Sequence, residues 1–250
     1  MLPEQHLALG SALFIGVLLG TMGSGGSILT LPVLVYLARI PPQSAVPMSM
    51  VIVGSASLFA ALLLARRGNF HRKAALLLGA TGVVGAYFGS AVTHLVSPST
   101  LMLFFAVLLL VVAVLMFRGG VEGLQPKTCR PVRCLSVGAC VGLLTGFLGV
   151  GGGFLLVPAL VFFAGVETKM AVGTSLAIIA LNSLAGLVGH IRYADLDWGL
   201  TAAFTALTLV GMLVGLSVGE RLSEVTLRRA FASILVVVGV VVGGLNLVAR

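Results

Sequence analysis

The chain has 250 residues, of which 59% are hydrophobic and only 9% charged, and its mean hydropathy is +1.18. A soluble domain carries roughly 25% charged residues, so this composition excludes a water-soluble surface and makes lipid the solvent for much of the chain. The net charge of +8 comes from basic residues in short loops between apolar segments, a pattern that indicates membrane orientation and argues against nucleic-acid binding.

The apolar segments predict an all-α integral membrane protein. A long first segment, Leu7–Leu37, precedes three runs near the length of about 20 residues that crosses the hydrocarbon core. These runs are Ala45–Ala65, Ala74–Leu95 and Leu101–Phe117. After a basic linker the same order recurs, with a long segment followed by three further runs: Leu135–Phe163, Ala171–Gly189, Leu200–Gly219 and Ala230–Val248.

The two halves of the chain read as copies of one module. Gly16 falls on Gly142 when the chain is shifted by 126 residues, and no gap is needed over about a hundred residues. The same shift brings further residues onto identical ones: Gly20, Gly23, Gly25, Gly26, Pro32 and Ser57 onto Gly146, Gly149, Gly151, Gly152, Pro158 and Ser183. We therefore predict a first repeat at 1–118, a cytoplasmic basic linker at 119–134 and a second repeat at 135–250.

A dense glycine cluster interrupts the first segment of each copy, at Gly23–Ser27 and at Gly149–Gly153. Glycine weakens a helix, and a broken helix in lipid is tolerated only where it is buried or lines a cavity. Each copy is thus predicted to open with a broken or re-entrant helix hairpin. More widely spaced glycines are instead predicted to let helices pack closely, as small residues four apart do: Gly16, Gly20, Gly85, Gly89, Gly142, Gly146, Gly211 and Gly215.

Two topologies are possible for such a chain. If the first segment of each copy crosses once, the copies are parallel; if it enters and turns back, each copy crosses three times and the copies are inverted. The inverted arrangement places twelve of the 15 Lys and Arg residues on the cytoplasmic side, and the parallel one places ten there. The charge bias therefore favours inverted repeats, with both termini outside a bacterial inner membrane.

Inverted repeats would bring the two glycine breaks toward the midplane from opposite faces. A new helix begins after each break, and its free backbone N–H groups and positive dipole end suit an anion. The predicted substrate-binding residues are those of the breaks and neutral donors in the adjacent spans. They are Ser24, Gly25, Gly26, Ser27, Gly149, Gly151, Gly152 and Gly153, together with Ser49, Thr174, Ser175 and Asn182.

The remaining polar residues argue against other classes of chemistry. The seven acidic residues fall in loops or at span ends, so the interior lacks a carboxylate relay for protons. The chain has no GxxxxGK[ST] phosphate-binding loop and no paired interior carboxylates, which indicates no enzyme, no catalytic residue, no metal site and no cofactor. An inside-negative potential expels anions at about 2.3 kcal/mol per charge per 100 mV, so passive export is physically sufficient.

Three stretches of the sequence resemble the sulfite exporter TauE/SafE family of bacterial membrane transporters. They are GLLTGFLGVGGGFLLVPAL at 142–160, its degenerate counterpart GVLLGTMGSGGSILTLPVL at 16–34, and AVGTSLAIIALNSLAG at 171–186. The family often carries a Gly-Asn-x-Asp-Trp turn in each copy. Here the second copy keeps Asp197 and Trp198, whereas the first reads GNFHRK at 68–73 and lacks both the acid and the tryptophan.

The resemblance implies a substrate among sulfite, sulfonates and related sulfur-containing anions. We therefore expect a secondary transporter of a small sulfur oxyanion or organosulfonate, whose partners are that anion and the lipid bilayer. A passive anion channel with the same break-lined pore remains an alternative, and the direction of transport stays open.

Overall fold

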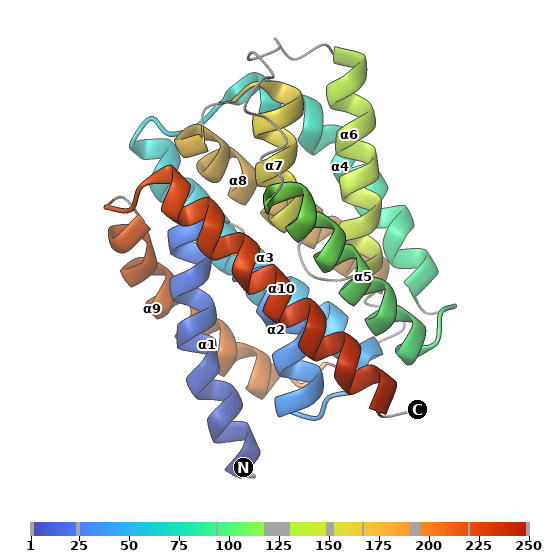
Figure 1. Cartoon of the computed structure of the whole chain (residues 1–250). Coiled ribbons are helices and arrows are strands. Elements are labelled where there is room, and N and C mark those ends of the chain that lie inside the picture. The colour runs from blue at the N-terminus through green and yellow to red at the C-terminus, as the bar shows by residue number, and fades with distance from the viewer. Residues whose placement is uncertain are drawn as a thin grey trace.

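The chain folds into helices throughout the residues that the computed structural model describes, which are 3–23, 26–93, 95–117, 131–148, 153–166, 168–190, 196–219 and 221–248. The described residues form ten α-helices, and a short π-helical turn, Val33–Leu37, extends the second of them. Their arrangement is drawn in Figure 1. In chain order the helices are α1 Pro3–Met22, α2 Ser27–Pro32, α3 Pro42–Arg66, α4 Arg72–Thr93, α5 Pro98–Phe117, α6 Pro131–Leu148, α7 Gly153–Ala164, α8 Thr168–His190, α9 Trp198–Gly219 and α10 Glu224–Val248.

Six helices in the described part of the chain are long and apolar enough to cross a membrane, and these are α3, α4, α5, α8, α9 and α10. They coincide with the six predicted runs of about 20 residues. The apolar stretches Leu9–Met22, Ser27–Leu37 and Cys134–Leu148, which lie beside the glycine breaks, are shorter. The predicted all-helical membrane fold is thereby confirmed, with three full-length helices following each interrupted segment.

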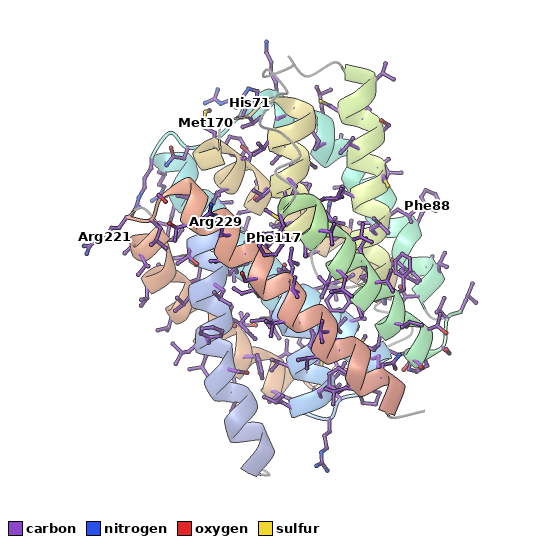
Figure 2. All side chains as sticks on the ribbon, viewed as in Figure 1. His71, Phe88, Phe117, Met170, Arg221 and Arg229 are labelled. Carbon is purple, nitrogen blue, oxygen red and sulfur yellow. The ribbon has the colours of Figure 1, made fainter. Side chains whose placement is uncertain are left out.

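Large apolar side chains cover the outside of the helices, as lipid requires. Leu76 is 72% exposed, Phe88 on α4 is 61% exposed, and Val237 on α10 is 61% exposed. Phe88 projects from the outer side of its helix in Figure 2. Many hydroxyls and amides lie inside instead, where Ser49, Ser175 and other polar side chains are fully buried. An inside that is more polar than the outside is the arrangement expected of a protein dissolved in a bilayer.

The spaced glycines hold two helix pairs in close contact, as predicted. On α1, a Cβ added to Gly16 would lie 2.2 Å from the Thr208 carbonyl oxygen of α9, and one added to Gly20 would lie 2.2 Å from the Met212 carbonyl oxygen. On α9, a Cβ at Gly211 would in turn lie 2.1 Å from the Leu13 carbonyl oxygen of α1. The backbones of α1 and α9 thus touch directly, which only glycine permits.

The second helix pair, α4 and α6, meets in the same way at positions 126 residues away. A Cβ added to Gly142 would lie 2.1 Å from the Gly82 carbonyl oxygen, and one added to Gly146 would lie 1.9 Å from the Ala86 carbonyl oxygen. Gly85 and Gly89 of α4 face α6 in return. The first helix of each half of the chain therefore packs on a helix of the other half.

Helix caps also recur at the 126-residue offset. The Leu200 N–H donates to the Asp197 carboxylate at 3.0 Å at the start of α9, and the Ala74 N–H donates to the His71 Nδ1 at 3.1 Å at the start of α4. His71 stands where the family turn has its acid, and its ring nitrogen takes over the capping acceptor role. The missing acid in the first copy is thus replaced by another acceptor at the same place.

The two chain termini and the α3–α4 loop lie at opposite ends of the helix bundle, as Figure 1 and Figure 2 show. In Figure 1 the chain starts at the lower end of α1 and finishes at the lower end of α10. The labels of α1 and α2 lie in the lower part of that view, and those of α6 and α7 in the upper part. His71, in the α3–α4 loop, lies beside Met170 of α8 at the upper end in Figure 2, and the His71 N–H donates to the Thr174 hydroxyl at 2.9 Å.

Candidate functional site

The first glycine break closes a tight hairpin between α1 and α2. Gly23 has a φ of +71°, a left-handed conformation that glycine adopts without strain. A Cβ on Gly26 would lie 2.2 Å from the Ile15 carbonyl oxygen and 2.5 Å from the Leu19 backbone nitrogen. Gly26, predicted as a substrate-binding residue, therefore also allows α2 to fold back against α1.

The break touches a helix that follows the second glycine break. A Cβ on Gly23 would meet the Val172 side chain of α8 at 2.5 Å. One turn further along α8 lies Ser175, whose hydroxyl donates to the Val172 carbonyl at 2.8 Å. The structure thus brings the predicted residue Ser175 close to the end of α1.

The two helices that begin after the breaks are α2 and α7, and they contact each other. Ser27, the first residue of α2, is fully buried, and no side-chain oxygen caps this helix end. Gly153 is the first residue of α7. The other predicted break residues lie outside the residues that the structure describes: Ser24, Gly25, Gly149, Gly151 and Gly152.

The hydroxyls predicted from the adjacent spans are buried and engaged by backbone carbonyls. Ser49 donates to the Val46 carbonyl at 2.7 Å, which mirrors the bond of Ser175 at the 126-residue offset. Thr174 donates to the Met170 carbonyl at 2.6 Å and accepts from the His71 N–H. A hydroxyl that donates to its own helix must turn away from that backbone carbonyl before its proton can bind an anion.

Asn182 differs from these hydroxyls. Its side chain is fully buried in α8, and neither its oxygen nor its nitrogen has a hydrogen-bond partner. The amide lies against Gly82 of α4, because a Cβ added there would sit 2.8 Å from Oδ1 and 3.0 Å from Nδ2. Of the predicted side chains that the structure describes, Asn182 is therefore the one whose donors are fully available.

Two residues outside the predicted set share this property. The hydroxyls of Ser57 on α3 and Ser183 on α8 are buried without a hydrogen-bond partner. They occupy equivalent positions in the repeat, and this equivalence is the sequence signal that could have marked them. The signal was too weak on its own, because a buried serine is more often bonded to its own helix.

The core that surrounds these groups is electrically neutral. No Asp, Glu, Lys, Arg or His occurs in the sequence stretches 45–65, 74–93 and 170–189, which form most of α3, α4 and α8. The basic residues lie at helix ends, where Arg66, Arg72 and Lys73 are exposed. Any anion held among these three helices must therefore be bound by neutral donors and backbone dipoles.

Proteins with a similar sequence are named as probable membrane transporters. The family model "Sulfite exporter TauE/SafE" matches residues 8–242. A "Probable membrane transporter protein" of Xylella fastidiosa strain 9a5c is 32% identical over 245 residues, which are 94% of each chain. The Bacillus subtilis "Probable membrane transporter protein YdhB" is 25% identical over 222 residues, which cover 86% of this chain and 91% of the relative. No solved structure gives a significant match.

Proposed function

The chain belongs to the sulfite exporter TauE/SafE family of membrane transporters, and from this we propose that it moves a small sulfur oxyanion or organosulfonate across the membrane by a secondary transport mechanism. The family match over nearly the whole chain carries the proposal, because it makes the protein a transporter and not an enzyme. Six candidate spans make it a multi-pass membrane protein. A neutral, polar interior with buried donors supports an anion as the substrate.

We place the substrate between the two breaks and the spans that face them. The contact between α2 and α7, the burial of Ser27 and the proximity of Gly23 to α8 support a site where the two hairpins converge. The full set is Ser24, Gly25, Gly26, Ser27, Gly149, Gly151, Gly152, Gly153, Ser49, Thr174, Ser175 and Asn182.

Counterflow in proteoliposomes tests the transport mechanism. Vesicles preloaded with unlabelled sulfite or methanesulfonate are expected to accumulate the labelled anion transiently and with saturation, because a carrier exchanges bound substrate across the membrane. A passive channel with the same pore would instead conduct large single-channel currents and show no counterflow. Linear, non-saturating flux in protein-containing vesicles would overturn the carrier mechanism.

We further propose that the repeats are inverted, with the linker 119–134 in the cytoplasm and both termini outside. The contact between the α3–α4 loop and the start of α8 supports this arrangement, because parallel copies would put those two segments on opposite faces. The recurrence of helix pairs and caps at a 126-residue offset supports a pseudo-twofold relation.

Single-cysteine labelling checks the topology. Starting from a cysteine-free variant, Arg39→Cys is expected to react with an impermeant maleimide added outside cells, whereas Lys169→Cys is expected to react only after permeabilisation. Lys73→Cys serves as the control, since it should behave like Lys169→Cys. Labelling of Arg39→Cys and Lys169→Cys from the same side would refute the inverted arrangement.

A further inference from the structure

Three buried side chains in neighbouring helices have hydrogen-bonding groups that the protein leaves unused. They are Ser57 on α3 and Asn182 and Ser183 on α8, all at most 1% exposed. An unmade hydrogen bond in a buried group is costly, and an apolar residue would fit the same space without that cost. Their presence therefore points to a ligand that supplies the missing hydrogen-bond partners: acceptors for the Asn182 N–H and serine O–H groups, and a donor for the Asn182 oxygen.

A second buried amide in the described chain shows what a purely structural asparagine looks like here. Asn246 of α10 donates to the Ser99 carbonyl at 2.9 Å, and its oxygen accepts from the Ser99 hydroxyl at 3.1 Å. It ties α10 to α5 with both of its polar atoms. Asn182 is fully buried, whereas Asn246 is 7% exposed, and Asn182 makes no such tie.

The three unused side chains lie where α8 packs between α3 and α4. Ser183 lies opposite Gly54 of α3, because a Cβ on that glycine would be 2.9 Å from the Ser183 Cβ and 3.6 Å from its Oγ. Ser57 follows Gly54 by three residues and so lies on the same face of α3. Asn182 adjoins Ser183 in sequence and rests against Gly82 of α4.

The group supplies hydrogen-bond donors but no charge. The amide carries two N–H donors and each serine one O–H donor, which suits the oxygens of an oxyanion. The inner stretches of the three helices, 45–65, 74–93 and 170–189, hold no charged residue. The titratable His190 lies about two turns beyond Asn182 at the end of α8, where its Nδ1 is 3.0 Å from the Gly186 carbonyl oxygen. The cost of moving an ion out of water rises with the square of its charge, so a neutral site penalises a dianion about fourfold more than a monoanion of similar size.

We propose that Asn182, Ser57 and Ser183 form a neutral anion-binding group that selects singly charged sulfur anions, such as hydrogensulfite and alkylsulfonates, over dianions such as sulfite and sulfate. This inference rests on the proposed transport function and deepens it by naming the charge state of the substrate. Ser57 and Ser183 are additional binding residues beyond the break-lined set.

The wild-type protein provides the first test, which needs no variant. Counterflow is measured at equal pH on both sides and at zero membrane potential, from mildly acidic to mildly alkaline pH. Sulfite flux is expected to fall about tenfold per pH unit once hydrogensulfite loses its proton, because the monoanion fraction falls by that factor. Methanesulfonate keeps one charge throughout, so its flux is expected to stay constant, and sulfate is expected not to compete with it.

Substitutions then assign the selectivity to these residues. Asn182→Ala, Ser57→Ala and Ser183→Ala are each expected to raise the half-saturation concentration for methanesulfonate about tenfold or more, as loss of a hydrogen bond to a charged group predicts. Asn182→Asp is expected to abolish flux, because it adds a negative charge. Asn246→Ala is the matched control and is expected to leave half-saturation unchanged.

The outcomes separate this inference from the proposed function. Methanesulfonate counterflow together with equal flux of sulfate would overturn the charge selection and leave the transport function standing. Unchanged half-saturation in all three alanine variants would overturn the residue assignment. If no sulfur anion gives counterflow, the proposed function fails, and the inference that rests on it fails too.

Discussion

Gly146→Ala is expected to separate α6 from α4 and to lower the thermal stability of the protein sharply. The added methyl group would lie 1.9 Å from the Ala86 carbonyl oxygen and 2.6 Å from its carbon, both of which are backbone atoms. Backbone atoms cannot rotate away, so α4 and α6 must move apart where their glycines are in contact. Overpacking typically costs about 1–3 kcal/mol, and a clash with backbone belongs at the upper end or beyond.

The measurement is the apparent unfolding temperature of the purified protein in detergent. Gly244→Ala in α10 is the matched control, because a Cβ there meets nothing within 4 Å. That control is expected to be neutral or slightly stabilising, since alanine favours a helix over glycine by about 1 kcal/mol. Gly20→Ala at the α1–α9 contact should behave like Gly146→Ala. Equal melting of Gly146→Ala and Gly244→Ala would show that the close contact between α4 and α6 is not formed.

Gly151→Leu is expected to abolish transport while the protein remains folded and abundant in the membrane. This glycine belongs to the second break, where we propose that backbone N–H groups approach the anion, and a leucine side chain would occupy the place of the substrate. The measurements are counterflow in proteoliposomes and membrane abundance, compared with the wild-type protein. Normal counterflow in a folded Gly151→Leu protein would remove the break from the binding site.

Gly26→Ala tests the role of the first break in packing α2 against α1. Because a Cβ on Gly26 would clash with the backbone of α1, this variant is expected to melt at a lower temperature than the wild-type protein. Gly152 falls on Gly26 at the 126-residue shift, so a substitution there would not test binding alone. Gly151 is therefore the more discriminating position for a test of binding.

Much of the architecture could be predicted from local sequence patterns. Runs such as Ala45–Ala65 are long and apolar enough to specify a span by themselves, and α3 extends over that run. The clusters at Gly23–Ser27 and Gly149–Gly153 also mark where helices end and begin, since α1 ends at Met22 and α7 begins at Gly153. These features depend on composition and spacing within a few turns, so no knowledge of distant contacts was needed.

Sequence patterns could not predict which helix packs against each row of closely packed glycines. The spacing of Gly16 and Gly20 indicates that some helix packs closely on α1, and the same holds for Gly142 and Gly146 on α6. Only the folded chain pairs α1 with α9 and α6 with α4, so that each half of the chain contacts the other. A helix face lined with small residues can pack on any other such face. Which two helices pair therefore depends on the packing of the whole protein.

The same division applies to the candidate site. The sequence by itself determined a membrane protein with two interrupted segments and a short set of neutral polar residues in its interior. Tertiary structure decided which of those residues have free donors, since Ser49 and Ser175 bond to their own helices whereas Ser57, Asn182 and Ser183 do not. A buried hydroxyl can bond to its own helix in nearly any context, so its availability depends on the rotamer that neighbouring helices impose. At Asn182 that neighbour is Gly82 of α4, a hundred residues away in the sequence.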